Sequence, residues 1–296
     1  MLPAEILKNT GAYSDLEEPV ILASGELGIY YINTEKIMPD EGTWKKYGNN
    51  DHAMIQHACA MTIRDKQFSR IIDLVTNLVE SKLPKIGTMA ISGGQRRDWL
   101  FSGPVAAKLQ VPHISLYKDG KISLVQPNGK KEDIDSIKKL NDFYAVHVVD
   151  LLTKGSSVYE GNKSWVPNLR SHGAKIKDLV TIVNRKQGGE ERLKKISIKT
   201  TSIIDIDHQF FNDYSQNPDR AIAYFSNPKA WGEKYLREHG TLALLENFDP
   251  SGNKLSRGKK FLTLYGDILK EAGKMQELSN SVKKRYKYQL SNLLKN

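Results

Sequence analysis

The feature that most constrains the fold is a series of short apolar runs that alternate with polar and helix-like segments. The runs span residues 85–91, 112–117, 145–150, 178–185 and 200–206. Runs of this length, rich in Val and Ile, are typical of buried strands. Their alternation with helical segments favours an α/β fold, in which helices flank both faces of a parallel sheet.

Two helical segments accompany the predicted strands. Residues 51–81 have helical spacing of their apolar positions, and residues 99–109 predict a second helix. We expect Pro104 in the first turn of that second helix, where proline is tolerated. After residue 206 strand patterns fade, and the remaining segments predict a helical extension over 207–296.

The polar loops that follow four of these strands are the strongest functional signal. They read SGGQRRD, YKDGK, DLLTKGSS and NRKQGG, and each is rich in Gly, Lys, Arg or Asp. In open parallel sheets, ligands bind at the carboxyl ends of the strands. The four loops therefore predict one shared site.

The DLLTKGSS loop (150–157) offers a carboxylate, hydroxyls and a glycine. Asp150 can accept hydrogen bonds from the two hydroxyls of a ribose, and the turn at Gly155 with Ser156 offers amides to a phosphate. The alternative is that Asp150 and Ser156 only cap a turn and a helix. Pro167 then either kinks the following helix or restarts it.

The SGGQRRD loop combines Gly93 and Gly94 with Arg96 and Arg97. Guanidinium groups bind phosphate oxygens bidentately, so this loop suits a pyrophosphate. The alternative is a solvated loop in which one arginine pairs with Asp98.

The remaining two loops carry further cations. Lys118 and Lys121 stand in a long polar span from 117 to about 143, which we expect to be a mobile loop able to cover a developing negative charge. Within it, QPNGKK predicts a hairpin turn. Arg185 follows a buried strand and can bind a carboxylate. For both loops the alternative is a solvated or ion-paired surface.

Composition narrows the classes of protein. No apolar run is long enough to span a membrane, and the amino-terminal residues do not resemble a signal peptide. Cys59 is the single cysteine, which fits a reducing cytoplasm. Residues 254–296 hold eleven basic and three acidic residues of a chain with net charge +10. Such a basic segment can bind nucleic acid, but the interpretation we favour is a solvated helix face.

In this order the loops resemble the orotate phosphoribosyltransferase family of type I phosphoribosyltransferases. VVDLLTKGSS resembles the family's phosphoribosyl-diphosphate motif, and IVNRKQGGEERL resembles its VDRxEGGxENL segment. VILASGELGIYYIN (20–33) resembles its amino-terminal segment, and YKDGK lies where the family has its mobile RKxxKxHG loop. The resemblance covers residues 1–206, with a hood segment within 1–50.

The resemblance implies transfer of the phosphoribosyl group of 5-phosphoribosyl diphosphate to orotate, with Mg²⁺ on the diphosphate and a homodimeric enzyme. Its implied donor-binding residues are Asp150, Thr153, Lys154, Gly155, Ser156 and Ser157. To these we add Gly93, Gly94, Arg96 and Arg97 at the diphosphate, from the chemistry of the SGGQRRD loop itself. It implies that Lys118 and Lys121 stabilise the leaving pyrophosphate, with Asp150 as the third catalytic residue. Arg185, Thr153, Tyr31 and Ile32 would contact orotate.

Four positions depart from the family pattern. Val149 replaces the first of two acids, Ala23 a lysine, Tyr117 an arginine and Ser123 a histidine. We expect Arg96 and Arg97 to supply charge in their place. Two alternatives stay open: a phosphoribosyltransferase for another base, and a non-catalytic sensor that binds the donor or a nucleotide.

Overall fold

The computed structural model describes residues 2–40, 42–84, 86–134 and 139–293. Its backbone contacts divide the chain into two compact units. We call Met1–Ala12 with Asn33–Asp207 the sheet unit, and Tyr13–Ile32 with His208–Asn296 the helical unit. The sequence predicted one domain over 1–206 and an extension over 207–296; in the structure, residues 13–32 group with the extension.

The sheet unit is built on a seven-stranded sheet with the order β6-β5-β4-β3-β7-β8-β9. The strands are β3 (Thr88–Gly94), β4 (His113–Leu116), β5 (Ile122–Val125), β6 (Lys131–Asp133), β7 (Phe143–Leu152), β8 (Lys175–Asn184) and β9 (Lys199–Asp205). Strands β4, β3, β7, β8 and β9 are mutually parallel, and these correspond to the five predicted runs. The α/β fold class is therefore confirmed.

Strands β5 and β6 were not predicted. They add an antiparallel hairpin to β4 inside the span that we expected to be a long loop. Ile122, Leu124 and Val125 bury their side chains, and that burial holds β5 on the sheet. The predicted QPNGKK turn joins the two strands, with Gln126 and Gly129 closing it through backbone hydrogen bonds.

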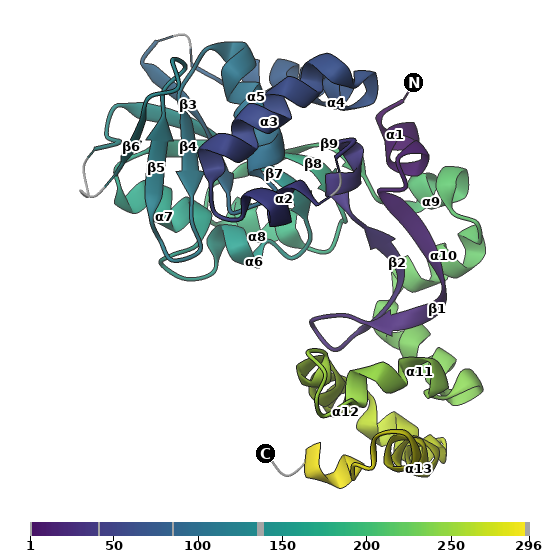
Figure 1. The fold of residues 1–296 in the computed structure, drawn as a ribbon. Helices are drawn as coiled ribbons and strands as arrows, with labels where there is room; N and C mark the ends of the chain where they lie inside the picture. Colours follow the sequence, from purple (N-terminus) through teal and green to yellow (C-terminus); the bar gives the residue numbers. More distant parts are fainter. Residues whose placement is uncertain (1, 41, 85, 135–138, 294–296) are drawn as a thin grey trace. The chain divides into compact units, whose positions relative to one another are not determined.

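Helices cover both faces of this sheet (Figure 1). One face carries α3 (Asp51–Arg64), α4 (Lys66–Glu80) and α5 (Trp99–Leu109), and the other carries α6 (Ser156–Tyr159), α7 (Trp165–Ser171) and α8 (Gly189–Lys195). Shorter elements are α1 (Pro3–Asn9), η1 (Thr34–Ile37) and α2 (Thr43–Tyr47).

Three helix predictions are refined. The helical span 51–81 is two helices, because Asp65 ends α3 and its side chain accepts from the Phe68 amide to start α4. Helix α5 begins at Trp99, so Pro104 lies in its interior and the first-turn prediction was wrong. Pro167 lies in the first turn of α7, which is a separate helix, so the chain restarts there.

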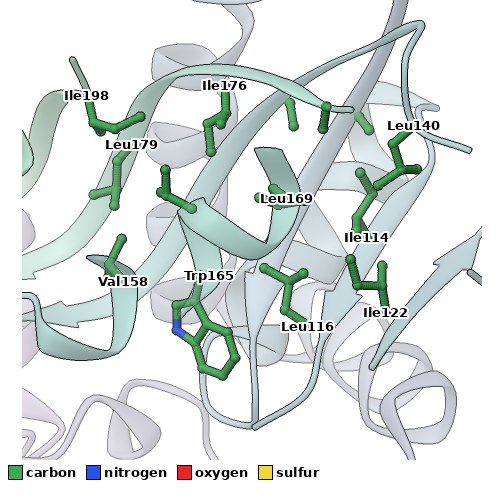
Figure 2. Close-up of a cluster of buried hydrophobic side chains, with 14 of the residues drawn as sticks. Ile114, Leu116, Ile122, Leu140, Val158, Trp165, Leu169, Ile176, Leu179 and Ile198 are labelled. Carbon is green, nitrogen blue, oxygen red and sulfur yellow. The ribbon is translucent and has the colours of Figure 1, made fainter. Parts of the chain in front are cut away.

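A hydrophobic core lies between the sheet and helices α6, α7 and α8. Val158, Trp165 and Leu169 from these helices pack against strand residues that include Leu116 and Leu179 (Figure 2). Trp165 is only 5% exposed. The core thus fixes α6 and α7 behind the carboxyl ends of β3 and β7.

The helical unit has a two-stranded antiparallel sheet of β1 (Tyr13–Ile21) and β2 (Leu27–Ile32). Its helices are α9 (His208–Tyr214), α10 (Pro218–Ser226), α11 (Pro228–His239), η2 (Leu242–Phe248), α12 (Leu255–Glu271), α13 (Lys274–Tyr286) and η3 (Leu290–Leu293). Phe248, Phe261 and Tyr265 anchor its core. Within the described ranges, no helix has the length and apolar character needed to cross a membrane.

Candidate functional site

A pocket of about 370 Å³ opens at the carboxyl ends of β3 and β7. Three of the four loops that the sequence singled out contribute to it. Its walls are Gln95, Arg96, Arg97, Asp98, Lys118, Val149, Asp150, Leu151, Ser157, Val158 and Trp165. This is the edge of the sheet at which a ligand was predicted.

Asp150 lies near the end of β7 with its carboxylate facing this pocket. Its Oδ2 accepts a 2.5 Å hydrogen bond from the Thr34 hydroxyl, and the Arg97 Nε lies 3.9 Å from the same oxygen. Thr34 is fully buried, so one carboxylate oxygen is held in place. The carboxylate is open to a ligand hydroxyl from the pocket.

Asp98 is a second carboxyl beside Asp150. Its Oδ1 accepts from the Asp150 amide at 2.9 Å, and its Oδ2 accepts from the Gly94 amide at 3.0 Å. Burial and then the negative charge of Asp150 raise the pKa of Asp98 well above its usual value. Through its two hydrogen bonds Asp98 links β3 to β7.

Gly93 and Gly94 have a packing role. A Cβ on Gly93 would overlap Ser102, and one on Gly94 would lie 2.8 Å from Asp98 Oδ2 and closer still to the Trp165 ring. Because the Gly94 amide is already bonded to Asp98, it does not point to a ligand. Donor binding by these two glycines, which the sequence predicted, stays a prediction.

The loop after β7 turns sharply toward α6. Gly155 has a φ of 75° and stands at the helix N-cap, so the turn needs glycine. No side chain caps this helix, so the predicted capping role of Ser156 is not observed. Ser156 and Ser157 are exposed at the first helical positions, where amides lack intrahelical partners.

The loop after β8 lies against the loop after β7. The Arg185 amide donates to the Leu152 carbonyl at 2.9 Å, and a Cβ on Gly189 would come within 2.5 Å of the Thr153 carbonyl. The predicted residues Thr153, Lys154 and Arg185 are thus on adjoining loops. Arg185 itself is half-buried.

Lys118 and Lys121 occupy a tight turn between β4 and β5. Tyr117 and Lys121 close that turn through a 2.9 Å backbone hydrogen bond. Lys118 lines the pocket, whereas the Lys121 side chain is 81% exposed and its Nζ lies 3.9 Å from Asp119. Of the two predicted lysines, only Lys118 is brought to the site.

Gln95 connects the arginine loop to this turn. Its side-chain carbonyl accepts from the Lys118 amide at 2.9 Å, and its side-chain amide donates to Asn49 at 2.6 Å. Its own backbone amide donates to the Leu116 carbonyl at 2.8 Å. Gln95 therefore sets the spacing between Lys118 and the two arginines.

Ser123 and Tyr117 belong to a hydrogen-bond network around the buried Asp51 and Lys131. They stand where the family has a histidine and an arginine. The Asp51 carboxylate is fully buried and accepts from Ser123 at 2.6 Å and from Lys131 Nζ at 2.5 Å. Lys131 also donates to the Tyr117 hydroxyl at 3.2 Å. Burial alone would raise the pKa of Asp51, but hydrogen bonds from Lys131, Ser123 and Ser115 outweigh it and lower the pKa to about 2.

Tyr31, Ile32 and Ala23 belong to the helical unit. Tyr31 is 53% exposed on β2, and Ile32 is buried at the end of the same strand. Lys260 of α12 donates to the Ala23 carbonyl at 3.0 Å. The predicted contacts of Tyr31 and Ile32 with a base stay a prediction.

Sequence reasoning missed four residues of the site: Thr34, Gln95, Asp98 and Trp165. Asp98 was considered only as an ion-pair partner for an arginine. Thr34 is 116 positions from Asp150, and no local pattern signals such a contact. Among the described residues, no group of three His, Cys, Asp or Glu side chains forms a metal site.

Comparisons with known proteins find curated relatives and solved structures that carry two different names. No family model matches the chain. The adenine phosphoribosyltransferase of Pasteurella multocida is 26% identical over 149 residues, which cover 47% of this chain and 77% of that protein. A Shigella flexneri protein of the same name is 29% identical over 150 residues, covering 47% and 76%.

Two solved structures of orotate phosphoribosyltransferases also align with the chain. The protein from Aeropyrum pernix is 21% identical, with a TM-score of 0.48, and the alignment covers 72% of this chain and 98% of that one. The protein from Francisella tularensis is 14% identical, with a TM-score of 0.46, and covers 79% and 96%.

Proposed function

We propose that this chain, which is a divergent member of the type I phosphoribosyltransferase family, transfers the phosphoribosyl group of 5-phosphoribosyl diphosphate to a nitrogenous base. The observation that carries the proposal is the pocket at the end of β7, where Asp150 stands beside Arg97 and the exposed Ser157 lines the same pocket. A carboxylate, a guanidinium and a hydroxyl-rich turn match the ribose, diphosphate and 5-phosphate of the donor.

In this reaction a ring nitrogen of the base forms a bond to C1 of the ribose while the bond from C1 to the diphosphate oxygen breaks. The electron pair leaves on the diphosphate, and the proton on the base nitrogen passes to solvent. The protein contributes positioning and charge stabilisation. Asp150 would hold the ribose hydroxyls, and Arg96, Arg97 and Lys118 would face the leaving diphosphate.

We expect Mg²⁺ to arrive on the donor's diphosphate, where it would neutralise part of the charge. Asp98 is bonded to two backbone amides, so Asp150 is the carboxylate at the pocket that can contact such an ion. This donor set fits a metal held by the substrate and not one held by the protein.

Orotate is the acceptor that we propose. The support is the NRKQGG loop, which lies against the loop after β7: the Arg185 amide donates to the Leu152 carbonyl, and Gly189 lies against the Thr153 carbonyl. From there the guanidinium of the half-buried Arg185 would bind the carboxylate of orotate. Adenine is the second candidate, because the curated relatives carry that name. Adenine has no carboxylate, so it gives Arg185 no comparable role.

Pyrophosphate release separates these candidates. Purified protein would be supplied with 5-phosphoribosyl diphosphate, Mg²⁺ and one of orotate, adenine, uracil, hypoxanthine or no base. We expect release with orotate, and a loss of at least tenfold in kcat/KM in Arg185→Ala. Release with adenine alone, unaffected by Arg185→Ala, would establish the second candidate and refute the first.

Donor binding without release for any base would indicate the sensor instead. The homodimer is also a proposal, and sedimentation equilibrium on the same preparation tests it. A molecular mass near 33.4 kDa at assay concentration would refute the dimer.

A further inference from the structure

A second pocket of about 430 Å³ adjoins the first. Its walls are Lys118, Ser157, Glu160, Gly161, Asn162, Lys163, Ser164 and Trp165. Lys118, Ser157 and Trp165 line both pockets, so the two volumes meet at these three side chains. We call the second volume the annex. The sequence predictions assign nothing to residues 160–164, which form its outer wall.

The outer wall is a turn that its own hydrogen bonds hold in place. The Ser164 hydroxyl donates to the Glu160 carbonyl, the Ser164 amide donates to Gly161 at 3.1 Å, and Gly161 has a φ of 86° that favours glycine. Asn168, which is 4% exposed, donates from its side chain to the Gly120 carbonyl at 3.0 Å. The wall and the lysine turn are thereby fixed to each other through α7.

Lys163 is directed along this junction. Its side chain passes Gly120, since three of its carbons lie 3.5–3.8 Å from where a Cβ on that glycine would stand. Lys163 is an exposed residue, but the aliphatic part of its side chain packs on the lysine turn and the residue lines the annex with Lys118. Two cationic side chains therefore converge on one volume.

The charges of these two lysines are not neutralised by nearby acids. Within the part of the chain that the structure describes, neither Lys118 nor Lys163 has a carboxylate at ion-pair distance. Glu160, the one acid in the annex wall, accepts from the Tyr159 hydroxyl at 2.7 Å and lies 3.5 Å from Arg192. The annex thus favours an anion.

We propose that Lys163 contacts the leaving group, and that Lys118 and Lys163 together stabilise the departing diphosphate. Lys163 takes the part that the family resemblance gave to Lys121, whose exposed side chain lines neither pocket. The diphosphate would lie between Arg96 and Arg97 on one side and the lysine pair on the other. This inference rests on the proposed function.

The test compares Lys163→Ala and Lys163→Arg with Lys121→Ala as the matched control. Lys121 and Lys163 are both exposed lysines near Gly120, so the two alanine variants remove the same charge from the same surface. Calorimetry would measure binding of magnesium pyrophosphate and, separately, of ribose 5-phosphate. Pyrophosphate release would give kcat and KM for the donor.

We expect Lys163→Ala to weaken pyrophosphate binding at least tenfold and to lower kcat, while ribose 5-phosphate binding stays within twofold of wild type. Lys163→Arg should restore most of both losses, and Lys121→Ala should stay within twofold throughout. Unchanged pyrophosphate binding in Lys163→Ala, or an equal loss in Lys121→Ala, would overturn the inference. A wild-type protein that neither binds nor turns over the donor would instead overturn the proposed function.

Discussion

Two fully buried histidines predict that the sheet unit loses stability on mild acidification. His113 on β4 shares hydrogen bonds with Ser102 and Ser115, at 2.8 and 3.1 Å, and His147 on β7 shares one with Ser92 at 2.9 Å. Burial lowers the pKa of His113 to about 4 and the pKa of His147 to about 3, the latter with a smaller contribution from His113. In the unfolded chain both pKa values return to about 6.5.

Because the folded pKa values lie below the unfolded ones, the unfolded chain binds more protons between about pH 3 and 6.5. Stability is therefore complete above pH 6.5 and falls as the pH drops through that window. Each histidine should lose about 2 kcal/mol of unfolding free energy between pH 7 and pH 5, or about 4 kcal/mol together. Asp51 adds little there, because its pKa of about 2 places its own loss below pH 4. Asp98 acts in the opposite direction, because its raised pKa lets the folded chain bind a proton before the unfolded chain does, and it offsets part of the loss from the histidines.

Urea unfolding followed by tryptophan fluorescence measures this loss. In a Trp231→Phe background the three remaining tryptophans, Trp44, Trp99 and Trp165, all belong to the sheet unit. His147→Phe should remove about 2 kcal/mol, which is half of the histidine contribution, whatever it does to stability at pH 7. His208→Gln at an exposed position should leave the pH dependence unchanged. A pH dependence between 5 and 7 that is identical in His147→Phe and wild type would refute the reasoning.

Three further substitutions test the site and its supports. Lys131→Met removes the ion pair with the buried Asp51 and should destabilise the sheet unit by about 2 kcal/mol. This is less than the loss of a fully buried pair, because the Lys131 side chain is 34% exposed. Lys130→Met should be neutral in the same urea titration. Gly94→Ala should cost about 1–3 kcal/mol through overlap with Trp165, whereas Gly266→Ala, with no neighbour nearer than 3.7 Å, should not destabilise. Arg97→Ala should weaken donor binding about tenfold and Arg64→Ala should not; wild-type affinity in both Arg96→Ala and Arg97→Ala would contradict the role given to that loop.

The parts of the fold that the sequence predicted are those with a local cause. Five strands were predicted because each is a run of apolar residues bounded by turns. Strands β5 and β6 were missed, although the turn between them was predicted, because the four residues ISLV are too short to stand out between two polar stretches. Their position depends on pairing with β4, which lies outside the local pattern.

The candidate site likewise combines residues that have a local sequence signal with contacts that have none. Asp150, Arg97 and Lys118 were found because each ends a predicted strand or follows one. The interactions that position them, from Thr34 to Asp150 and from Gln95 to Lys118, span 116 and 23 positions and leave no spacing to recognise. The grouping of residues 13–32 with the carboxyl-terminal helices is likewise a long-range packing outcome.

The central claim is that the end of β7 binds a phosphoribosyl donor, and calorimetric titration with 5-phosphoribosyl diphosphate and Mg²⁺ tests it most directly. Asp150→Asn is the matched variant, since it keeps the shape of the side chain and removes the charge that would accept from the ribose hydroxyls. The account predicts saturable binding of one donor per chain in the wild type and at least tenfold weaker binding in the variant. No binding to the wild type, or equal binding to both proteins, would contradict it.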